Sequence, residues 1–193
     1  GVFVLQSVVE GVLTGFWPIL WVIIAAMYTY NVTVATGGMD TIKSTLAKIS
    51  PDRRIQALIL AFSFGGFLEA AAGFGTAVAI PASLLAGIGF NPIFAAIICL
   101  VANTVPVAFG GVGIPVITLA QVAELDLLAV TASIAYQLII FIIILPFALV
   151  LLLTKSFKSL KDVLGACLVS GVLFALFQTI TAVYIGPEVA AII

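Results

Sequence analysis

Apolar residues occur in long runs along this chain, and short polar segments separate the runs. Four of these runs lie at about 11–35, 92–120, 127–154 and 162–185. A helix needs about 20 apolar residues to cross a bilayer, so each run is long enough for one span. A further apolar run, 52–90, carries glycines near its centre. The pattern predicts an all-α integral membrane protein with several spans, in which 1–193 forms one transmembrane domain.

Composition agrees with this prediction and narrows the chemistry. Hydrophobic residues make up 64% of the chain and charged residues 8%, a balance typical of helical membrane proteins. The absence of histidine from the sequence excludes imidazole metal ligands and imidazole proton relays from these residues. Cys99 and Cys167 both stand in apolar segments, where a small buried thiol is the usual role. Because no charged segment precedes the first apolar run, we expect Gly1 to be an internal position of a longer chain.

The basic residues predict how the chain crosses the membrane. All 7 lie in two segments, 43–54 and 155–161, and the positive-inside rule places both segments in the cytoplasm. An even number of crossings must therefore separate them. Because three apolar stretches lie between the two segments, one of the stretches has to turn back.

The stretch 52–90 is the best candidate for the segment that turns back. Gly65-Gly66 and Gly73-Phe74-Gly75 divide it into two arms of about 14 residues, or about 21 Å each. Arms of that length are short for a hydrocarbon core of about 30 Å. We therefore predict a re-entrant helical hairpin that enters and leaves on the cytoplasmic side. Two short, tilted crossings satisfy the same parity and are the alternative.

Capping residues mark several helix starts. Ser50-Pro51 and Asn91-Pro92 each place a capping side chain before a proline, which is well suited to the first position of a helix. Asp126 precedes the run 127–154 in the same way. These residues predict helix starts at three positions.

Glu69 is the only charged residue in the middle of a long apolar run. A carboxylate in hydrocarbon is costly, so such a residue usually faces a cavity, a partner or a transported species, and intramembrane acids often mark proton paths. We therefore expect Glu69 to couple transport to protons. The structural alternative is a permanently paired or protonated Glu69 that only forms hydrogen bonds across the hairpin.

The apolar run 92–120 is predicted to contain a broken helix. Prolines and glycines punctuate its middle, and a proline removes a backbone donor and clashes with the preceding turn. Non-helical backbone at membrane depth occurs where it is buried in protein or lines a wet cavity. Close helix packing at the glycines is the alternative. The residues expected to form the broken backbone are Pro106, Gly110, Gly111 and Gly113.

Within this chain an anionic substrate must be held by amides and hydroxyls, because no lysine or arginine lies inside an apolar run. The start of the second hairpin arm offers free N–H groups, which favour an anion. The broken helix offers polar side chains on the other side. Each such residue, taken alone, more often forms a hydrogen bond between helices. The predicted substrate-binding set is Gly73, Gly75, Thr76, Asn103 and Thr104.

Several longer motifs occur in order from near the start of the chain to near its end. They are Gly15-Phe16-Trp17-Pro18-Ile19, Phe64-Gly65-Gly66-Phe67-Leu68-Glu69, Ala71-Ala72-Gly73-Phe74-Gly75, Gly89-Phe90-Asn91-Pro92, Asn103-Thr104-Val105-Pro106-Val107-Ala108-Phe109-Gly110, Gly113-Ile114-Pro115 and Ile185-Gly186-Pro187-Glu188. Together they resemble the L-lactate permease family of bacterial plasma-membrane carriers. Ala70 departs from the glycine that usually follows the glutamate in that family, which concerns the geometry of the hairpin tip.

The resemblance implies a secondary transporter for lactate, glycolate or another 2-hydroxy acid, working by proton symport in a multi-pass protein of the bacterial plasma membrane. It also implies a longer carrier, so that these residues work with protons, the lipid bilayer and the remainder of their own chain. We expect no cofactor, metal or nucleic acid. The apolar runs hold no paired acids and no serine beside a base, which argues against an enzyme. The alternatives are a sodium-coupled carrier of another organic anion and a membrane subunit that does not transport.

Overall fold

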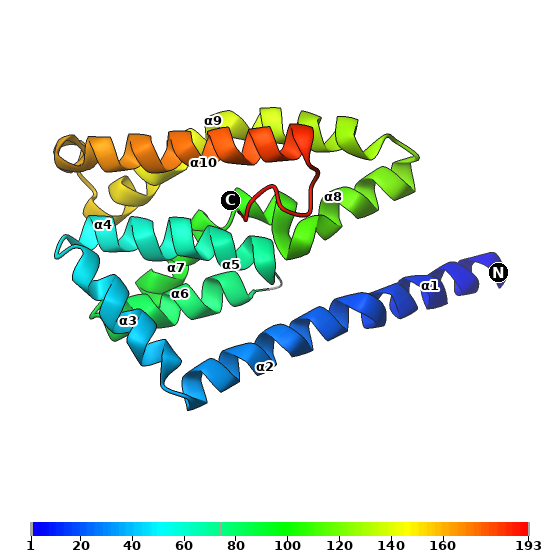
Figure 1. The fold of residues 1–193 in the computed structure, drawn as a ribbon, viewed down its shortest axis with the longest axis horizontal. Coiled ribbons are helices and arrows are strands. Elements are labelled where there is room, and N and C mark those ends of the chain that lie inside the picture. Colours follow the sequence, from blue (N-terminus) through cyan, green and yellow to red (C-terminus); the bar gives the residue numbers. More distant parts are fainter. Residues whose placement is uncertain (1, 74, 193) are drawn as a thin grey trace. The chain divides into compact units, whose positions relative to one another are not determined.

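The structure is a computed structural model that describes residues 2–73 and 75–192. Within these residues the regular structure is helical and contains no strand (Figure 1). Four helical stretches are long and apolar enough to cross a membrane. The prediction of an all-α, multi-span membrane protein is therefore confirmed. The chain divides into two compact units, Gly1–Asp40 and Thr41–Ile193.

In the first unit, α1 (Val2–Thr14) leads through a π-helical segment (Gly15–Leu20) into α2 (Trp21–Ala35). The helix is interrupted at Trp17, whose φ of −136° and ψ of 111° are extended. Pro18 explains the interruption, because a proline disfavours helical backbone in the residue before it. The membrane span expected over this part of the chain stays a prediction.

The connection between the two units is helical. α3 (Gly38–Ile49) carries an acidic residue, Asp40, in its first turn and a basic residue, Lys48, in its last turn. Both charges complement the helix dipole. Gly37, with a φ of +74°, separates this helix from the preceding one.

The stretch 52–90 folds as a helical hairpin with unequal arms (Figure 1). The first arm, Arg53–Ala71, is 19 residues long. It consists of α4 (Arg53–Ala57), a π-helical segment (Leu58–Phe64) and α5 (Gly65–Ala71). The second arm is α6 (Thr76–Gly87), with 12 residues. At 1.5 Å per residue the first arm is about 28 Å long and the second about 18 Å.

Gly65 and Gly66 do not interrupt the first arm, so the prediction of two arms of about 14 residues is wrong. Both glycines are buried: a Cβ on Gly65 would lie 3.4 Å from the Ala77 carbonyl oxygen, and one on Gly66 would lie 3.6 Å from the Phe174 ring. The pair serves close packing, and the chain turns only at 72–75. Since the first arm alone approaches the thickness of a hydrocarbon core, a re-entrant hairpin and two crossings both stay open.

The predicted broken helix is present as two helices with irregular backbone between them. α7 (Pro92–Ala102) is followed by a 3₁₀ turn (Pro106–Phe109) and by α8 (Gly110–Ala123). At the start of α8 three successive residues, Gly111, Val112 and Gly113, have left-handed backbone, with φ of +54°, +60° and +74°. We call residues 103–113 the break.

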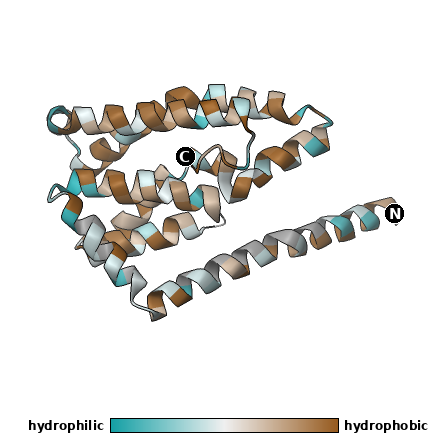
Figure 2. Ribbon diagram, in the orientation of Figure 1, coloured by the Kyte–Doolittle hydropathy of each residue, from teal (hydrophilic) through white to brown (hydrophobic). Residues whose placement is uncertain are grey.

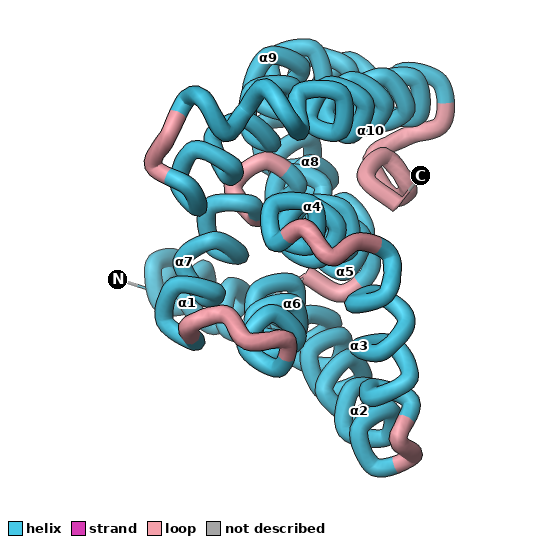
Figure 3. The backbone as a smooth tube through the Cα atoms, turned by 90° about the vertical axis from the view of Figure 1, so that its left-hand side faces the viewer, coloured by secondary structure: helices cyan, strands magenta, loops and turns pink. Residues whose placement is uncertain are grey.

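Two long helices complete the second unit. α9 (Leu127–Thr154) and α10 (Leu164–Tyr184) lie side by side in Figures 1 and 3, joined by a 3₁₀ segment (Phe157–Val163). They approach closely, because a Cβ on Gly171 would lie only 3.0 Å from the backbone of Ile143. Both helices are apolar over most of their length, and hydrophilic residues gather at the turn between them (Figure 2).

Helix caps follow the prediction at two of three positions. Asn91 and Asp126 accept hydrogen bonds from backbone amides in the first turns of α7 and α9. The start of α4 differs, because Asp52 rather than Ser50 is its cap and accepts from the Arg54 amide at 2.8 Å. The Ser50 hydroxyl accepts instead from the Asp52 amide at 3.1 Å, which holds the cap in place from outside the helix.

A core cluster joins the hairpin and the break to the two long helices. Ala70 of α5 and Phe109 of the 3₁₀ turn pack with Ala135 of α9 and Ala182 of α10, and all four are buried. Alanines on α9 and α10 leave room for the large Phe109 ring. The two long helices therefore support both the end of the first arm and the break.

Candidate functional site

At the tip of the hairpin, where Gly73 and Gly75 lie between the two arms, the backbone of Gly73 lies against the break. Gly73 and Gly75 have φ of +57° and +90°, values that residues other than glycine rarely adopt. A Cβ on Gly73 would lie 2.8 Å from the backbone nitrogen of Gly111. Glycine is therefore required at position 73 both by its backbone conformation and by the close approach of the break.

Glu69 lies on α5, one turn before the tip, and is 3% exposed. Its carboxyl group occupies the space beside Gly110, where a Cβ would lie 3.0 Å from the Glu69 Cδ. Asn103, the residue that ends α7, interacts with the Glu69 carboxyl through its side chain. Three elements thus bring one acid, one amide and one glycine together.

These residues surround a cavity of about 250 Å³. Its polar lining comes from Glu69 and Asn103, and its glycines expose backbone. Apolar side chains from the break and from α8 form the rest. The complete lining is Glu69, Gly73, Gly75, Asn103, Val107, Gly110, Gly111, Ile114 and Pro115.

Two oxygens at this cavity have no hydrogen-bond donor. Glu69 Oε2 and Asn103 Oδ1 are both buried and without a partner among the described residues. A buried polar group without a partner costs about 1–3 kcal/mol. Both atoms are acceptors, so a proton, a ligand hydroxyl or a cation satisfies them, whereas an additional anion does not.

The structure leaves four of the predicted site residues outside the lining. The Thr76 hydroxyl donates to the Gly73 carbonyl at 2.8 Å, and the Thr76 amide donates to the same oxygen at 3.2 Å. Thr104 is exposed, and its hydroxyl donates to the Val101 carbonyl at 2.8 Å.

The other two are Pro106 and Gly113. Pro106 is buried. Gly113 packs against Pro187, where a Cβ would lie 2.7 Å from the carbonyl carbon. All four therefore shape the tip or the break around the cavity, with their polar groups used internally where they have any.

Sequence reasoning did not identify the apolar side of the cavity. Val107, Ile114 and Pro115 contribute their side chains to the lining. Each stands among other apolar residues, so hydrophobicity gives no signal that separates them from core or lipid-facing positions. Their positions within and just after the break are the only sequence feature that distinguishes them.

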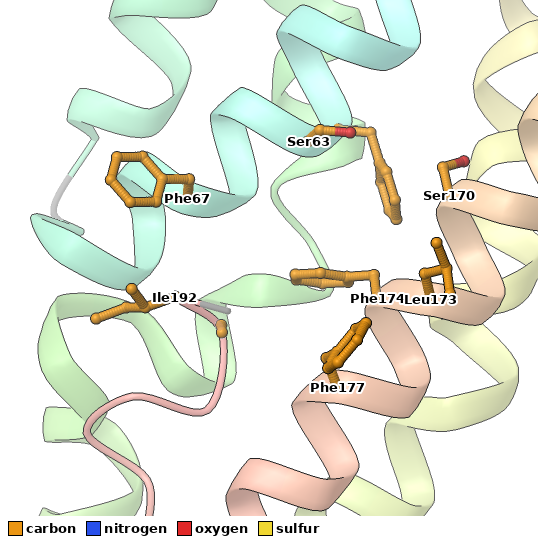
Figure 4. Close-up of a pocket in the computed structure, with 9 residues that line it drawn as sticks. Ser63, Phe67, Ser170, Leu173, Phe174, Phe177 and Ile192 are labelled. Atoms are coloured by element: carbon orange, nitrogen blue, oxygen red, sulfur yellow. The ribbon is translucent and has the colours of Figure 1, made fainter.

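A larger cavity, of about 340 Å³, lies between the first arm and α10 (Figure 4). Phe174 and Phe177 project into it from α10, and Phe67 lies on the opposite side (Figure 4). Serines supply its only polar side chains, and no titratable residue lines it. This cavity therefore offers nothing that binds a proton or neutralises a charge. The smaller cavity at Glu69 is the candidate site.

Metal chemistry finds no support in the described residues. Within 2–73 and 75–192 no group of three or more histidine, cysteine, aspartate or glutamate side chains could hold a metal ion. Glu69 is the one acid in the cavity lining. The two acceptors without donors suit a proton, a ligand hydroxyl or a single cation.

Comparison with known proteins agrees with the motifs. The model of the L-lactate permease family matches residues 2–193. An L-lactate permease of Streptococcus iniae is 51% identical over 98% of this chain, and one of Escherichia coli strain K12 is 44% identical over 98%. A glycolate permease, GlcA of Escherichia coli strain K12, is 46% identical over 92%. No solved structure matches the chain.

The matched relatives are longer than this chain. It covers 40% of the Streptococcus iniae protein, 34% of the Escherichia coli L-lactate permease and 32% of the glycolate permease. The family consists of multi-pass membrane transporters rather than enzymes, in agreement with the four apolar helical stretches found here. This chain belongs to the L-lactate permease family.

Proposed function

We propose that the full-length carrier transports lactate and related 2-hydroxy monocarboxylates such as glycolate across the bacterial plasma membrane by proton symport, with Glu69 as the proton site. The names of the relatives support the substrate class. The observation that carries the proton site is the buried Glu69 oxygen without a partner, at the cavity where the hairpin tip meets the break.

Charge explains why the substrate and a proton enter together. A monocarboxylate brings a negative charge into a cavity whose lining contains an acid and no basic residue. Two nearby carboxylates repel each other, so an anionic substrate binds better when Glu69 is protonated. By thermodynamic linkage, the bound substrate favours protonation of Glu69 to the same extent. A single acid at this position is therefore sufficient for coupling.

The other lining residues take complementary roles in this proposal. Asn103 presents an amide to the substrate and to the Glu69 carboxyl, so it responds to both ligands. Gly73 and Gly75 let the backbone of the tip approach the substrate without a side chain between them. Thr76 fixes the tip by its two bonds to the Gly73 carbonyl. Thr104 lies on the exposed side of the break and has no contact role.

Sodium is the alternative coupling ion, because two oxygens without donors also suit a cation beside broken helices. Uptake of labelled lactate by the full-length carrier in proteoliposomes, with either a pH gradient or a sodium gradient, separates the two. Proton symport predicts accumulation with the pH gradient alone. Accumulation that requires sodium would contradict it.

Glu69→Gln tests the proton site directly. Glutamine keeps the shape but cannot titrate, so gradient-driven accumulation should be lost while exchange of lactate across the membrane continues. The control is Glu124→Gln, an exposed acid at the end of α8, which should behave as the wild type. Wild-type accumulation in Glu69→Gln would rule out the coupling role.

A further inference from the structure

We propose that Val107 and Ile114 form an alkyl-recognition wall that sets which 2-hydroxy acid the carrier accepts. The inference rests on the proposed function, because it assumes that the cavity of about 250 Å³ is where the acid binds. It concerns the one part of the lining to which sequence reasoning assigned no role.

The polar and the apolar side chains of the cavity lining come from different elements. Glu69 projects from α5 and Asn103 stands at the end of α7, whereas Val107 lies in the 3₁₀ turn and Ile114 in α8. The glycines between them contribute no side chain. A bound acid that places its carboxylate and hydroxyl near the polar side therefore turns the substituent on its second carbon towards the break.

A carrier that discriminates between these acids needs such a wall. Glycolate and lactate share the carboxylate and the neighbouring hydroxyl and differ by one methyl group on the second carbon. Polar groups of the site contact what the two acids share, so they cannot discriminate between them. A single methylene in a fitted apolar pocket is worth about 10- to 200-fold in selectivity. Relatives named for lactate and for glycolate are 51% and 46% identical to this chain, so the two preferences occur within closely similar sequences.

Val107 is held towards the cavity by its neighbours in the 3₁₀ turn. Pro106 and Phe109 are both buried on the protein side of this turn, and Phe109 belongs to the core cluster. Val107 itself is 46% exposed and lines the cavity. Because Val107 is exposed between the buried Pro106 and the partly buried Ala108, its side chain can be exchanged with little loss of core packing.

Ile114 is positioned by a different constraint. The residue before it, Gly113, has a φ of +74° and no room for a Cβ against Pro187. The backbone that carries Ile114 therefore has little freedom to move away from a ligand. Pro115 also lines the cavity, but its ring is rigid and exposed, and a substitution there would change the helix itself. Val107 and Ile114 are thus the two positions where side-chain size alone can be varied.

The test measures selectivity in the full-length carrier in proteoliposomes. Glycolate, lactate and 2-hydroxybutyrate, which form a series of increasing alkyl length, compete with labelled lactate for uptake. Val107→Ala and Ile114→Val should raise the preference for 2-hydroxybutyrate over lactate by about 10-fold or more. Val107→Leu should shift the preference towards glycolate. The matched control is Leu119→Ala on the same helix, an exposed apolar residue that does not line the cavity and should leave the ratios unchanged.

The outcomes distinguish the wall from the function on which it rests. If the wild-type carrier takes up none of the three acids, the proposed function is wrong, and the proposal of an alkyl-recognition wall fails with it. If the wild type transports but the ratios stay within twofold in both the enlarging and the narrowing variants, the wall is wrong and the function stands. Opposite shifts in the two kinds of variant support the wall, and they also exclude general damage to folding, which would lower all rates together.

Discussion

The two ends of the hairpin are held by different kinds of contact. We call the end where the first arm begins and the second arm ends the base of the hairpin. There the Arg54 side chain donates to the Ser159 carbonyl at 2.7 Å and pairs with Asp52 at 2.6 Å. The neighbouring Arg53 places its guanidinium 5.3 Å from the centre of the Phe90 ring, at the end of the second arm. Charged side chains thus join the base to the turn before α10 and join the two arms to each other.

Among the described residues at the tip, no ion pair or cation–π contact is found. There the closest approach is between the backbones of Gly73 and Gly111, and the carboxyl of Glu69 fills the place where Gly110 has no side chain. Oxygens of Glu69 and Asn103 lack donors among the described residues. The charged groups at the base therefore have partners. Around the tip the backbones pack closely, but two buried oxygens lack a hydrogen-bond donor. Charged contacts that support the structure thus lie at one end of the hairpin, and polar groups without a donor lie at the other.

The base is also the part whose charges persist over a wide pH range. The Arg54 side chain, by its hydrogen bonds, holds the pKa of Asp52 below its ordinary value of 3.8. A carboxyl whose pKa is lowered in the folded state adds stability above its unfolded pKa and loses that contribution as the pH falls through the lowered value. The base contact is therefore intact at neutral and mildly acidic pH.

The largest effect is expected from Gly110→Ala, in the break beside Glu69. The new Cβ would overlap the Glu69 carboxyl group, so either the acid or the break must move. Overpacking of this kind costs about 1–3 kcal/mol, and uptake of lactate should fall by about 10-fold or more. Gly165→Ala is the control, because nothing lies within 4 Å of the added Cβ there. Wild-type uptake by Gly110→Ala would show that the position of Glu69 does not matter.

A smaller effect is expected from Asn103→Ala. Loss of a buried amide that contacts a charged ligand should weaken lactate binding by about 1–3 kcal/mol, measured as the apparent affinity for uptake. Thr104→Val is the neighbouring control, since that hydroxyl is exposed and bonded to the Val101 carbonyl. Equal effects of the two substitutions would mean that the cavity lining does not define the binding site.

The smallest effect on transport is expected at the base. Arg54→Ala removes an ion pair and a bond to the Ser159 carbonyl, and we expect a small loss of stability, because ion pairs near the surface contribute little. Thermal unfolding in detergent measures this loss of stability. The control is Lys158→Ala, at an exposed position. The apparent affinity for lactate should stay at the wild-type value. A change in affinity larger than that of Asn103→Ala would remove the distinction between base and tip.

For the hairpin and the break, sequence patterns predicted which elements form better than they predicted how long each helix is. The turn at Gly73 and Gly75 and the break after Asn103 were both expected, because glycine and proline there are incompatible with continuous helix. The continuous helix through Gly65-Gly66 was not expected, because only the neighbours Ala77 and Phe174 show that these glycines serve packing. Local sequence marks where a helix can end, and tertiary contacts decide where it does.

The polar residues and the glycines of the candidate site were predictable, and its apolar side chains were not. Glu69 and Asn103 stand out as polar residues in apolar runs, and the structure places both at one cavity. Thr76 and Thr104 stand out equally, yet their hydroxyls bond to nearby carbonyls, a choice that depends on local geometry. Val107 and Ile114 could not be recognised, because an apolar residue that contacts a ligand has the same sequence signature as one that contacts lipid.

Val112, in the middle of the break, has an energetic consequence for the whole carrier. Its φ of +60° is unusual for a β-branched residue, and such left-handed backbone costs about 1–2 kcal/mol. Transporters alternate between conformations that differ by only a few kcal/mol, and about 1.4 kcal/mol changes a ratio of populations tenfold. A rearrangement that returned this one residue to right-handed backbone would shift the balance between two such states by roughly an order of magnitude. The break therefore holds conformational energy at the point where we propose that the substrate binds.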